Sequence, residues 1–267
     1  MRQDLCSIFS DKIAVFTAHA AVQKNADTAY AYEQESNFFW LTGITEQGWQ
    51  LIVDGFTKKA WLVAPDVSEQ QRIFDGSLSY DDARSVSGVE EVVSVDEGAN
   101  ILDELAKSCD TVWSLDEHPH ADHFEFIVNP APAILWERLS GIFTEVKGAR
   151  ELLSRRRAIK STEEVRLIQQ TINSTVDAFS SIHENINSLR SEYEIEAEFN
   201  YSFTKSGTQG HAYDPIVAFA ANACTLHYGK NKDQLPENGL VLLDVGARVG
   251  GYAADITRTY AVGTPTQ

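Results

Sequence analysis

Hydrophobic positions in the first half of the chain gather in short runs, at residues 13–16, 49–53, 60–64 and 111–115. Runs of this length suit strands, and the polar stretches between them, such as residues 99–107, suit helices. Strands that alternate with helices indicate a mixed α/β (α+β) fold in one compact domain. The pattern predicts that this domain spans residues 1–148.

The hydrophobic spacing changes to three or four residues beyond position 160, which predicts a long amphipathic helix. Ser161 and Glu164 form the pattern of a capping box before this helix, and Ser191 and Glu194 repeat the pattern before a second one. We assign both helices to a second domain, residues 149–267. Their apolar stripes consist of Val165, Ile168, Ile172, Val176, Phe179, Ile182 and Ile186 in the first helix and of Ile195, Phe199 and Phe203 in the second.

A hairpin is predicted near the end of the chain, where two strand-like runs flank the glycine-containing residues 248–251. A reversal centred between Val249 and Gly250 places Asp244 directly opposite Asp255, with Cβ atoms about 4.5–5.5 Å apart. Apolar neighbours on both faces indicate that the pair is buried, where an uncompensated charge costs several kcal/mol.

A divalent cation is the economical counter-charge for Asp244 and Asp255, because no Lys or Arg lies on that face of the strand pair. A turn displaced by one residue would instead put the two aspartates on opposite faces, one of them merely solvated.

Composition narrows the class of protein. The 267 residues are 43% hydrophobic and 23% charged, with a formal net charge of −17. This acidity disfavours nucleic acid and anionic membranes as partners. No apolar run approaches the roughly 18 residues of a membrane helix, and no signal peptide is evident, so a cytoplasmic location is expected. Three scattered cysteines without a C-x-x-C pair argue against a disulfide framework or a structural zinc site.

Four segments of the second half carry a resemblance, namely residues 215–217, 222–228, 242–247 and 252–259. Together they resemble the "pita-bread" metallopeptidases, in particular aminopeptidase P and prolidase. Residues 30–43 independently resemble the creatinase-like N-terminal domain that precedes the catalytic domain in those enzymes. The expected architecture is therefore a creatinase-like domain followed by the first half of a pita-bread domain. Glu33 departs from the resemblance, because the family often has Arg there.

The resemblance implies roles for individual residues. Asp244 would be a terminal ligand to one of two divalent metal ions, and Asp255 would bridge the two. His227 would donate a hydrogen bond to the substrate carbonyl or the tetrahedral intermediate. Thr257, two residues beyond Asp255 and on the same predicted face, is placed to hydrogen-bond a ligand carboxylate. His211 has no comparable support, so we assign it no function.

The metal site is incomplete in this sequence. The resemblance implies one further His and two Glu as ligands, and the twelve residues after Asp255 contain neither His nor Glu. The resemblance favours manganese as the metal, with cobalt or zinc as alternatives. We expect the 267-residue chain alone to be inactive.

The function expected of the full-length protein is that of a metal-dependent exopeptidase that removes the N-terminal residue from peptides with proline in second position. Prolidase activity on Xaa-Pro dipeptides and a non-catalytic pita-bread binding module are the alternatives. The expected partner is a proline-containing peptide, and the full-length protein is expected to form a homo-oligomer. The residues that follow Gln267 would separate the enzyme from the binding module.

Overall fold

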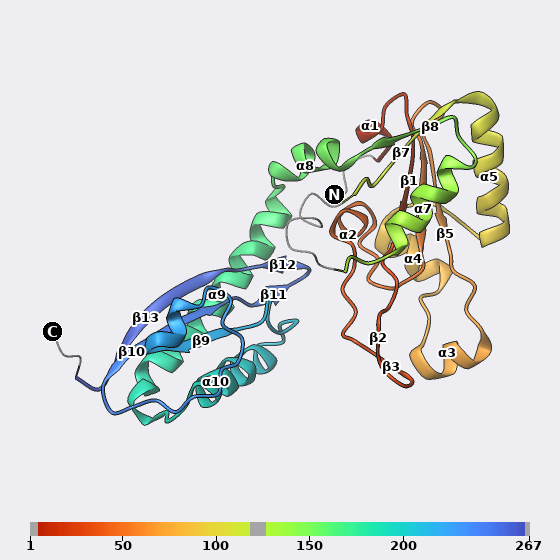
Figure 1. Cartoon of the computed structure of the whole chain (residues 1–267). Helices are drawn as coiled ribbons and strands as arrows, with labels where there is room; N and C mark the ends of the chain where they lie inside the picture. Colours follow the sequence, from red (N-terminus) through yellow and green to blue (C-terminus); the bar gives the residue numbers. More distant parts are fainter. Residues whose placement is uncertain (1–4, 118–126, 265–267) are drawn as a thin grey trace. The chain divides into compact units, whose positions relative to one another are not determined.

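The computed structural model describes residues 5–117 and 127–264, and the chain divides into two compact units, Met1–Ala158 and Ile159–Gln267 (Figure 1). The domain boundary expected at residue 148 lies ahead of this division, and the assignment of residues 1–148 and 149–267 to two domains stays a prediction. Within the described ranges, no helix is both long and apolar enough to cross a bilayer.

A six-stranded mixed sheet with the order β6-β5-β4-β1-β7-β8 forms the centre of the first unit. The four strands predicted from hydrophobic runs are confirmed as β1, β4, β5 and β7, and the helix predicted over residues 99–107 is confirmed as part of α5. The elements are α1 (Leu5–Ile8), β1 (Ile13–Thr17), β2 (Gln23–Asn25), β3 (Thr28–Ala29), α2 (Ser36–Thr42), β4 (Gln50–Asp54), β5 (Lys59–Val63), α3 (Glu69–Asp75), α4 (Tyr80–Ser87), β6 (Glu91–Val93), α5 (Val95–Ser108), β7 (Thr111–Ser114), α7 (Ala131–Ser140), β8 (Glu145–Gly148) and α8 (Arg150–Ala158).

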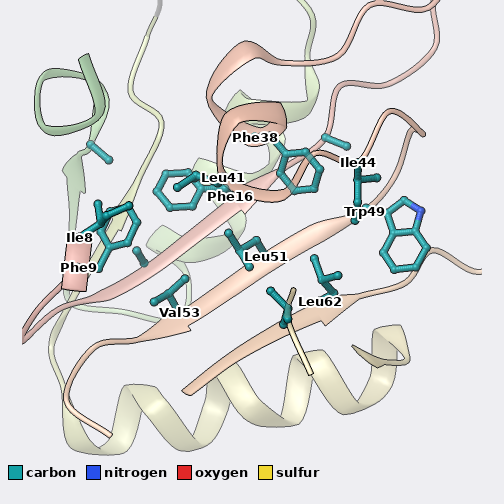
Figure 2. Close-up of a cluster of buried hydrophobic side chains, with 14 of the residues drawn as sticks. Ile8, Phe9, Phe16, Phe38, Leu41, Ile44, Trp49, Leu51, Val53 and Leu62 are labelled. Atoms are coloured by element: carbon teal, nitrogen blue, oxygen red, sulfur yellow. The ribbon is translucent and has the colours of Figure 1, made fainter. Parts of the chain in front are cut away.

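Both faces of this sheet are covered, which explains why its strands read as continuous apolar runs. Alternate residues of β1 point to opposite sides, so Phe16 joins one hydrophobic cluster and Val15 joins another. Helix α2 contributes Phe38 and Leu41 to the first cluster (Figure 2). Helices α5 and α7 supply apolar residues to the second cluster, among them Leu102 from α5.

The second unit packs two helices against one face of an antiparallel sheet with the order β13-β10-β9. The second predicted helix is confirmed, with its three apolar residues almost fully buried. The elements are α9 (Thr162–Asn185), η1 (Ile186–Ser188), α10 (Glu192–Lys205), β9 (Ile216–Phe219), η2 (Ala220–Cys224), β10 (Gly239–Val245), β11 (Arg248–Val249), β12 (Tyr252–Ala253) and β13 (Ile256–Val262).

Helix α9 begins as predicted, with a reciprocal capping box between Ser161 and Glu164. Its buried face differs from the predicted stripe, because Val165 and Val176 are exposed. The residues that face the rest of the unit are Thr171, Thr175, Ala178, Phe179 and Ile182.

Candidate functional site

The hairpin that carries Asp244 and Asp255 has a different register from the predicted one. Asp244 pairs with Thr257, so the reversal is centred between Gly250 and Gly251, one residue later than expected. Both glycines have positive φ, 57° and 79°, as a two-residue type I′ turn requires. The prediction that the two aspartates face each other directly is therefore wrong.

The two aspartates nevertheless lie on one face of the hairpin. A turn displaced by one whole residue moves every strand partner by two positions, and side chains two positions apart point to the same side. Asp255 is thus the diagonal neighbour of Asp244 across the ladder. The alternative, in which a displaced turn separates the two carboxylates, is also wrong.

The face that carries the aspartates is more open than expected. Along β10, Val241, Leu243 and Val245 are fully buried, whereas Asp244 is half-buried, and across the hairpin Asp255 is exposed. The prediction of a buried pair fails because α9 and α10 pack against the opposite face of the sheet. Burial alone therefore does not demand a counter-charge, and the case for one rests on the proximity of two like charges.

The hydroxyl group of Tyr213 joins the two carboxylates. Its oxygen lies 2.6 Å from Oδ1 of Asp244 and 3.1 Å from Oδ1 of Asp255. Burial raises the pKa of the Tyr213 phenol, and hydrogen bonding to Asp244 and the charges of both aspartates raise it further. The phenol therefore remains a hydrogen-bond donor to the pair.

Tyr213 was missed in the sequence because a tyrosine in a loop between a helix and a strand gives no periodic signal. The segment before it runs alongside the hairpin and is held there by backbone groups, which any sequence could supply. Its backbone hydrogen bonds to the hairpin run from Gln209 N to Arg248 O (2.8 Å), from Arg248 N to Gly210 O (2.9 Å) and from Ala212 N to Gly246 O (2.8 Å).

Gly246 permits the close approach of the hairpin backbone at Ala254 and of the Tyr213 ring. A Cβ atom at this position would lie 1.7 Å from the carbonyl oxygen of Ala254 and 3.2 Å from the ring of Tyr213. No side chain fits in that space, so a glycine is required between Asp244 and the hairpin tip.

His227 lies in the loop that follows η2, and its side chain is exposed. The next residue, Tyr228, is 7% exposed and packs in a small cluster with Ile216. Ile216 pairs with Asp244 in the sheet, so this loop is anchored on the face that carries the aspartates. Among the described residues, no hydrogen bond joins His227 to either aspartate.

Two other polar residues near the hairpin have weaker links to the pair. Thr257 lies opposite Asp244, but within the described ranges its hydroxyl makes no hydrogen bond to that carboxylate. Burial lowers the pKa of His211 against the charges of Glu196 and Asp214, which raise it. The ring of His211 contacts an asparagine amide rather than an aspartate, and no role follows for it.

The arrangement fits part of a divalent-cation centre. Two carboxylates that converge on one hydroxyl offer the hard oxygen ligands that such cations bind. Across residues 5–117 and 127–264, no group of three or more His, Cys, Asp or Glu is arranged to hold a metal ion. Asp244 and Asp255 thus fit two ligand positions and do not form a complete set.

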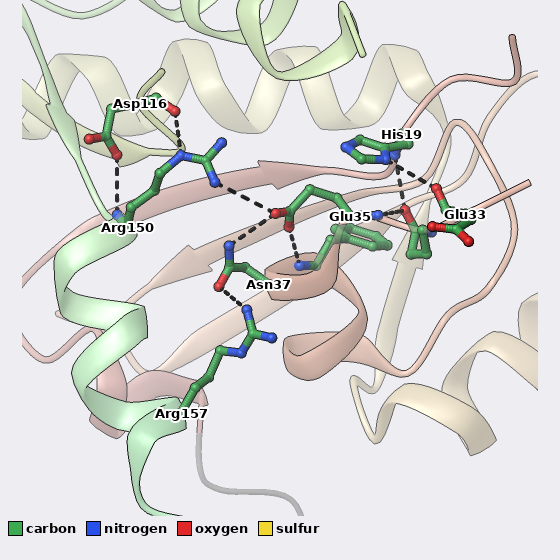
Figure 3. Close-up of polar contacts among 9 residues, drawn as sticks. His19, Glu33, Glu35, Asn37, Asp116, Arg150 and Arg157 are labelled. Atoms are coloured by element: carbon green, nitrogen blue, oxygen red, sulfur yellow. Dashed lines mark hydrogen bonds and ion pairs between the residues drawn. The ribbon is translucent and has the colours of Figure 1, made fainter. Parts of the chain in front are cut away.

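The N-terminal signature forms a separate polar network in the first unit (Figure 3). Glu35 caps α2 by accepting from the backbone N–H of Phe38 at 2.7 Å, and it also accepts from the Asn37 amide at 3.0 Å. A guanidinium nitrogen of Arg150 lies 3.8 Å from the same carboxylate, and Arg157 donates to the Asn37 carbonyl oxygen at 2.6 Å. This network ties α8 to the start of α2.

Glu33, the departure from the resembling signature, is exposed. Its carbonyl oxygen lies 3.1 Å from Nδ1 of His19.

Comparison with known proteins identifies both units. Residues 1–113 match the aminopeptidase P N-terminal domain, and residues 166–267 match metallopeptidase family M24. The Xaa-Pro aminopeptidase of Haemophilus influenzae is 31% identical over 90% of this chain and 54% of the relative. The Xaa-Pro aminopeptidase of Escherichia coli is 28% identical over 93% of this chain and 58% of its own length. The chain thus spans little more than half of these relatives.

Solved structures agree with these matches. A putative aminopeptidase P from Bacillus anthracis has a TM-score of 0.82 at 24% identity and covers 95% of this chain, which covers 61% of that structure. Aminopeptidase P from E. coli has a TM-score of 0.81 at 26% identity and covers 98% of this chain, which covers 63% of that structure. Both domain matches in this order, with these relatives, show that the chain belongs to the aminopeptidase P family of M24 metallopeptidases.

Proposed function

We propose that this chain contributes the first two metal ligands and a substrate-binding histidine to a metal-dependent exopeptidase. The reaction proposed for the full-length protein is removal of the N-terminal residue from peptides with proline in second position. The observation that carries the proposal is the convergence of the Asp244 and Asp255 carboxylates on the Tyr213 hydroxyl. The names of the relatives, Xaa-Pro aminopeptidases, support the substrate class.

The residues of this chain have separate tasks in the proposed reaction. Asp244 and Asp255 hold the cations through full carboxylate charges, and Tyr213 fixes the orientation of both carboxylates. His227, on its exposed loop, donates a hydrogen bond to the scissile carbonyl as negative charge develops there. When bound, divalent cations supply a water of lowered pKa and take up charge on the carbonyl oxygen. Manganese is the metal we propose.

Two alternatives lead to different experiments. Prolidase activity would restrict hydrolysis to Xaa-Pro dipeptides, so assays with dipeptides and longer peptides separate the two enzymes. A non-catalytic binding module would have no need of two carboxylates that converge on one hydroxyl, and the geometry therefore favours the enzyme.

Substitutions in the full-length protein test the proposal. We expect Asp255→Asn to abolish most hydrolysis of Xaa-Pro peptides and to reduce bound metal, because an amide lacks the charge that holds the cations. His227→Ala should lower kcat about 100- to 1000-fold while metal content stays normal. Asp177→Asn, an exposed change of the same kind on α9, is the control and should leave both quantities unchanged. Wild-type turnover by the Asp255→Asn enzyme would refute the metal assignment.

A further inference from the structure

The carboxylate of Glu192 is fully buried at the first residue of α10, and it accepts hydrogen bonds from residues 27 to 41 positions further along the chain. Oε1 accepts hydrogen bonds from the backbone N–H of Phe219 at 2.8 Å and from the Asn222 amide at 2.9 Å. Oε2 accepts from the Tyr228 hydroxyl at 2.9 Å and from the backbone N–H of Asp233 at 3.0 Å. One side chain therefore receives four hydrogen bonds.

These four donors mark the two ends and the middle of one segment, residues 219–233. Phe219 ends β9, Asn222 lies in η2, and Tyr228 directly follows His227. The segment returns to the helix at Asp233, whose carbonyl oxygen accepts from the backbone N–H of Glu192 at 2.9 Å. His227 is thus enclosed between two residues whose side chains donate to the same carboxylate.

Only a carboxylate can accept at both ends of the side chain. A glutamine at position 192 would direct an NH₂ group at two donors, either at Phe219 and Asn222 or at Tyr228 and Asp233. A buried backbone N–H would then lack its acceptor, which costs about 1–3 kcal/mol. The first turn of α10 also favours a negative charge at this position.

We infer that Glu192 is a positioning residue for His227: its carboxylate fixes residues 219–233 and thereby holds the histidine over the face that carries Asp244 and Asp255. The inference rests on the proposed function, because it assigns Glu192 a part in the same reaction. Glu192 touches neither substrate nor metal ligand and acts only through the loop.

The test uses Glu192→Gln in the full-length protein, alone and combined with His227→Ala. We expect kcat on an Xaa-Pro peptide to fall about 10- to 100-fold with unchanged metal content. In the His227→Ala background the same substitution should cause no further fall, since its effect passes through the histidine. Glu198→Gln, an exposed substitution on the same helix, is the matched control and should leave kcat unchanged. A fall of equal size in both backgrounds would overturn the inference.

Amide hydrogen exchange gives a second readout that does not depend on activity. In Glu192→Gln, the amide of Phe219 or Asp233 should exchange faster than in the wild type, and exchange in β10 should be unchanged. Unaltered exchange across residues 219–233 would overturn the inference. If the wild-type protein does not hydrolyse Xaa-Pro peptides, the proposed function fails, and exchange alone decides whether Glu192 fixes the loop.

Tyr228→Phe provides a milder variant if Glu192→Gln does not fold. It removes one of the four donors and leaves the carboxylate in place. We expect a smaller fall in kcat that again disappears in the His227→Ala background. A fall that persists there would contradict the inference.

Discussion

Tyr213 has one hydroxyl hydrogen to offer to two carboxylates. Oxygens of Asp244 and Asp255 both lie within hydrogen-bond distance of it, but a single O–H cannot satisfy both fully. Two negative charges on one open face then remain close to each other, and like charges at such a separation repel. A cation relieves that repulsion, which gives the proposed metal site a physical basis that does not require burial.

Ionisation of Tyr228 should lower the free energy of unfolding at alkaline pH. Burial and the hydrogen bond to Glu192 raise its pKa from 10.0 to about 12. In the folded protein the phenol therefore keeps its proton over a range of pH in which the phenol of the unfolded chain loses it. The stabilisation is fully present below pH 10 and is lost as the pH rises through 12, at up to about 1.4 kcal/mol per pH unit.

Urea unfolding between pH 8 and pH 12 measures this effect. The free energy of unfolding of the wild type should fall more steeply with pH above 10 than that of Tyr228→Phe, which cannot ionise. Parallel curves for the two proteins would show that Tyr228 ionises as easily in the folded state as in the unfolded one.

Some residues of the candidate site could be predicted from the sequence, and others could not. Asp244 and Asp255 could be brought to one hairpin, though not in the correct register, because both flank a glycine-rich tip, and a resemblance drew attention to His227. Tyr213 and Glu192 could not be found in this way. Each acts through contacts with residues far away in the sequence, 31 positions for Tyr213 with Asp244 and up to 41 for Glu192 with Asp233.

Among the elements, strands and helices were easier to predict than their registers. The short runs of β1 and β4 and the last three residues of β5 are buried on both faces, so their apolar character is unambiguous. The predicted centre of the hairpin would put the β-branched Val249 at a central position of a type I′ turn, where positive φ is strongly disfavoured for such a residue. Gly250 and Gly251 adopt the positive φ without that penalty, so turn chemistry favours the observed register where the hydrophobic pattern alone did not.

Helix α9 shows why an apolar stripe can mislead. Its buried face includes Thr175, whose hydroxyl accepts from the backbone N–H of Ala247 at 3.0 Å and donates to Thr171 O at 2.9 Å. A hydrophobicity pattern counts threonine as polar. It therefore predicts that the buried face of α9 contains Val165 and Val176, which are in fact exposed. Here the hydroxyl satisfies a buried amide of the hairpin.

Gly246→Ala should open the hairpin. Its new methyl group would overlap the carbonyl oxygen of Ala254, and neither backbone can move without breaking the ladder. We expect the second unit to lose about 3 kcal/mol or more of unfolding free energy, measured by chemical denaturation.

Gly229→Ala is the matched control, because nothing lies within 4 Å of its added Cβ. It should change the unfolding free energy by no more than about 0.5 kcal/mol. Equal stability of the two variants would contradict the close approach at Gly246.

At the scale of the whole molecule, the two compact units should separate under mild proteolysis. The chain between α8 and α9 is exposed, and Ile159 is 79% accessible. We expect trypsin to cleave first after Lys160 and to leave a protected fragment of the first unit. Electrophoresis with mass spectrometry identifies the fragment, and Lys160→Gln should delay it. Early cleavage throughout the first unit would show that it does not fold independently.

The 267-residue chain should bind metal weakly. Two carboxylates leave most of a cation's coordination to water, so calorimetric titration with Mn²⁺ should give a Kd of about 10⁻⁴ to 10⁻³ M, the range of weak calcium sites. Asp244→Asn should weaken binding further, and no Xaa-Pro peptide should be hydrolysed. Tight binding of two metal ions would mean that the site gains ligands in another way.

Strand β13 pairs on one side only, with β10, in the part of the chain that the structure describes. An edge of this kind is a template on which a strand of another copy can add. Each copy also carries a net charge of −17, and this charge opposes the approach of two such edges. The repulsion reaches only about 8 Å at physiological ionic strength. Salt screens the repulsion between copies, so higher salt should favour their association through the unpaired edge of β13.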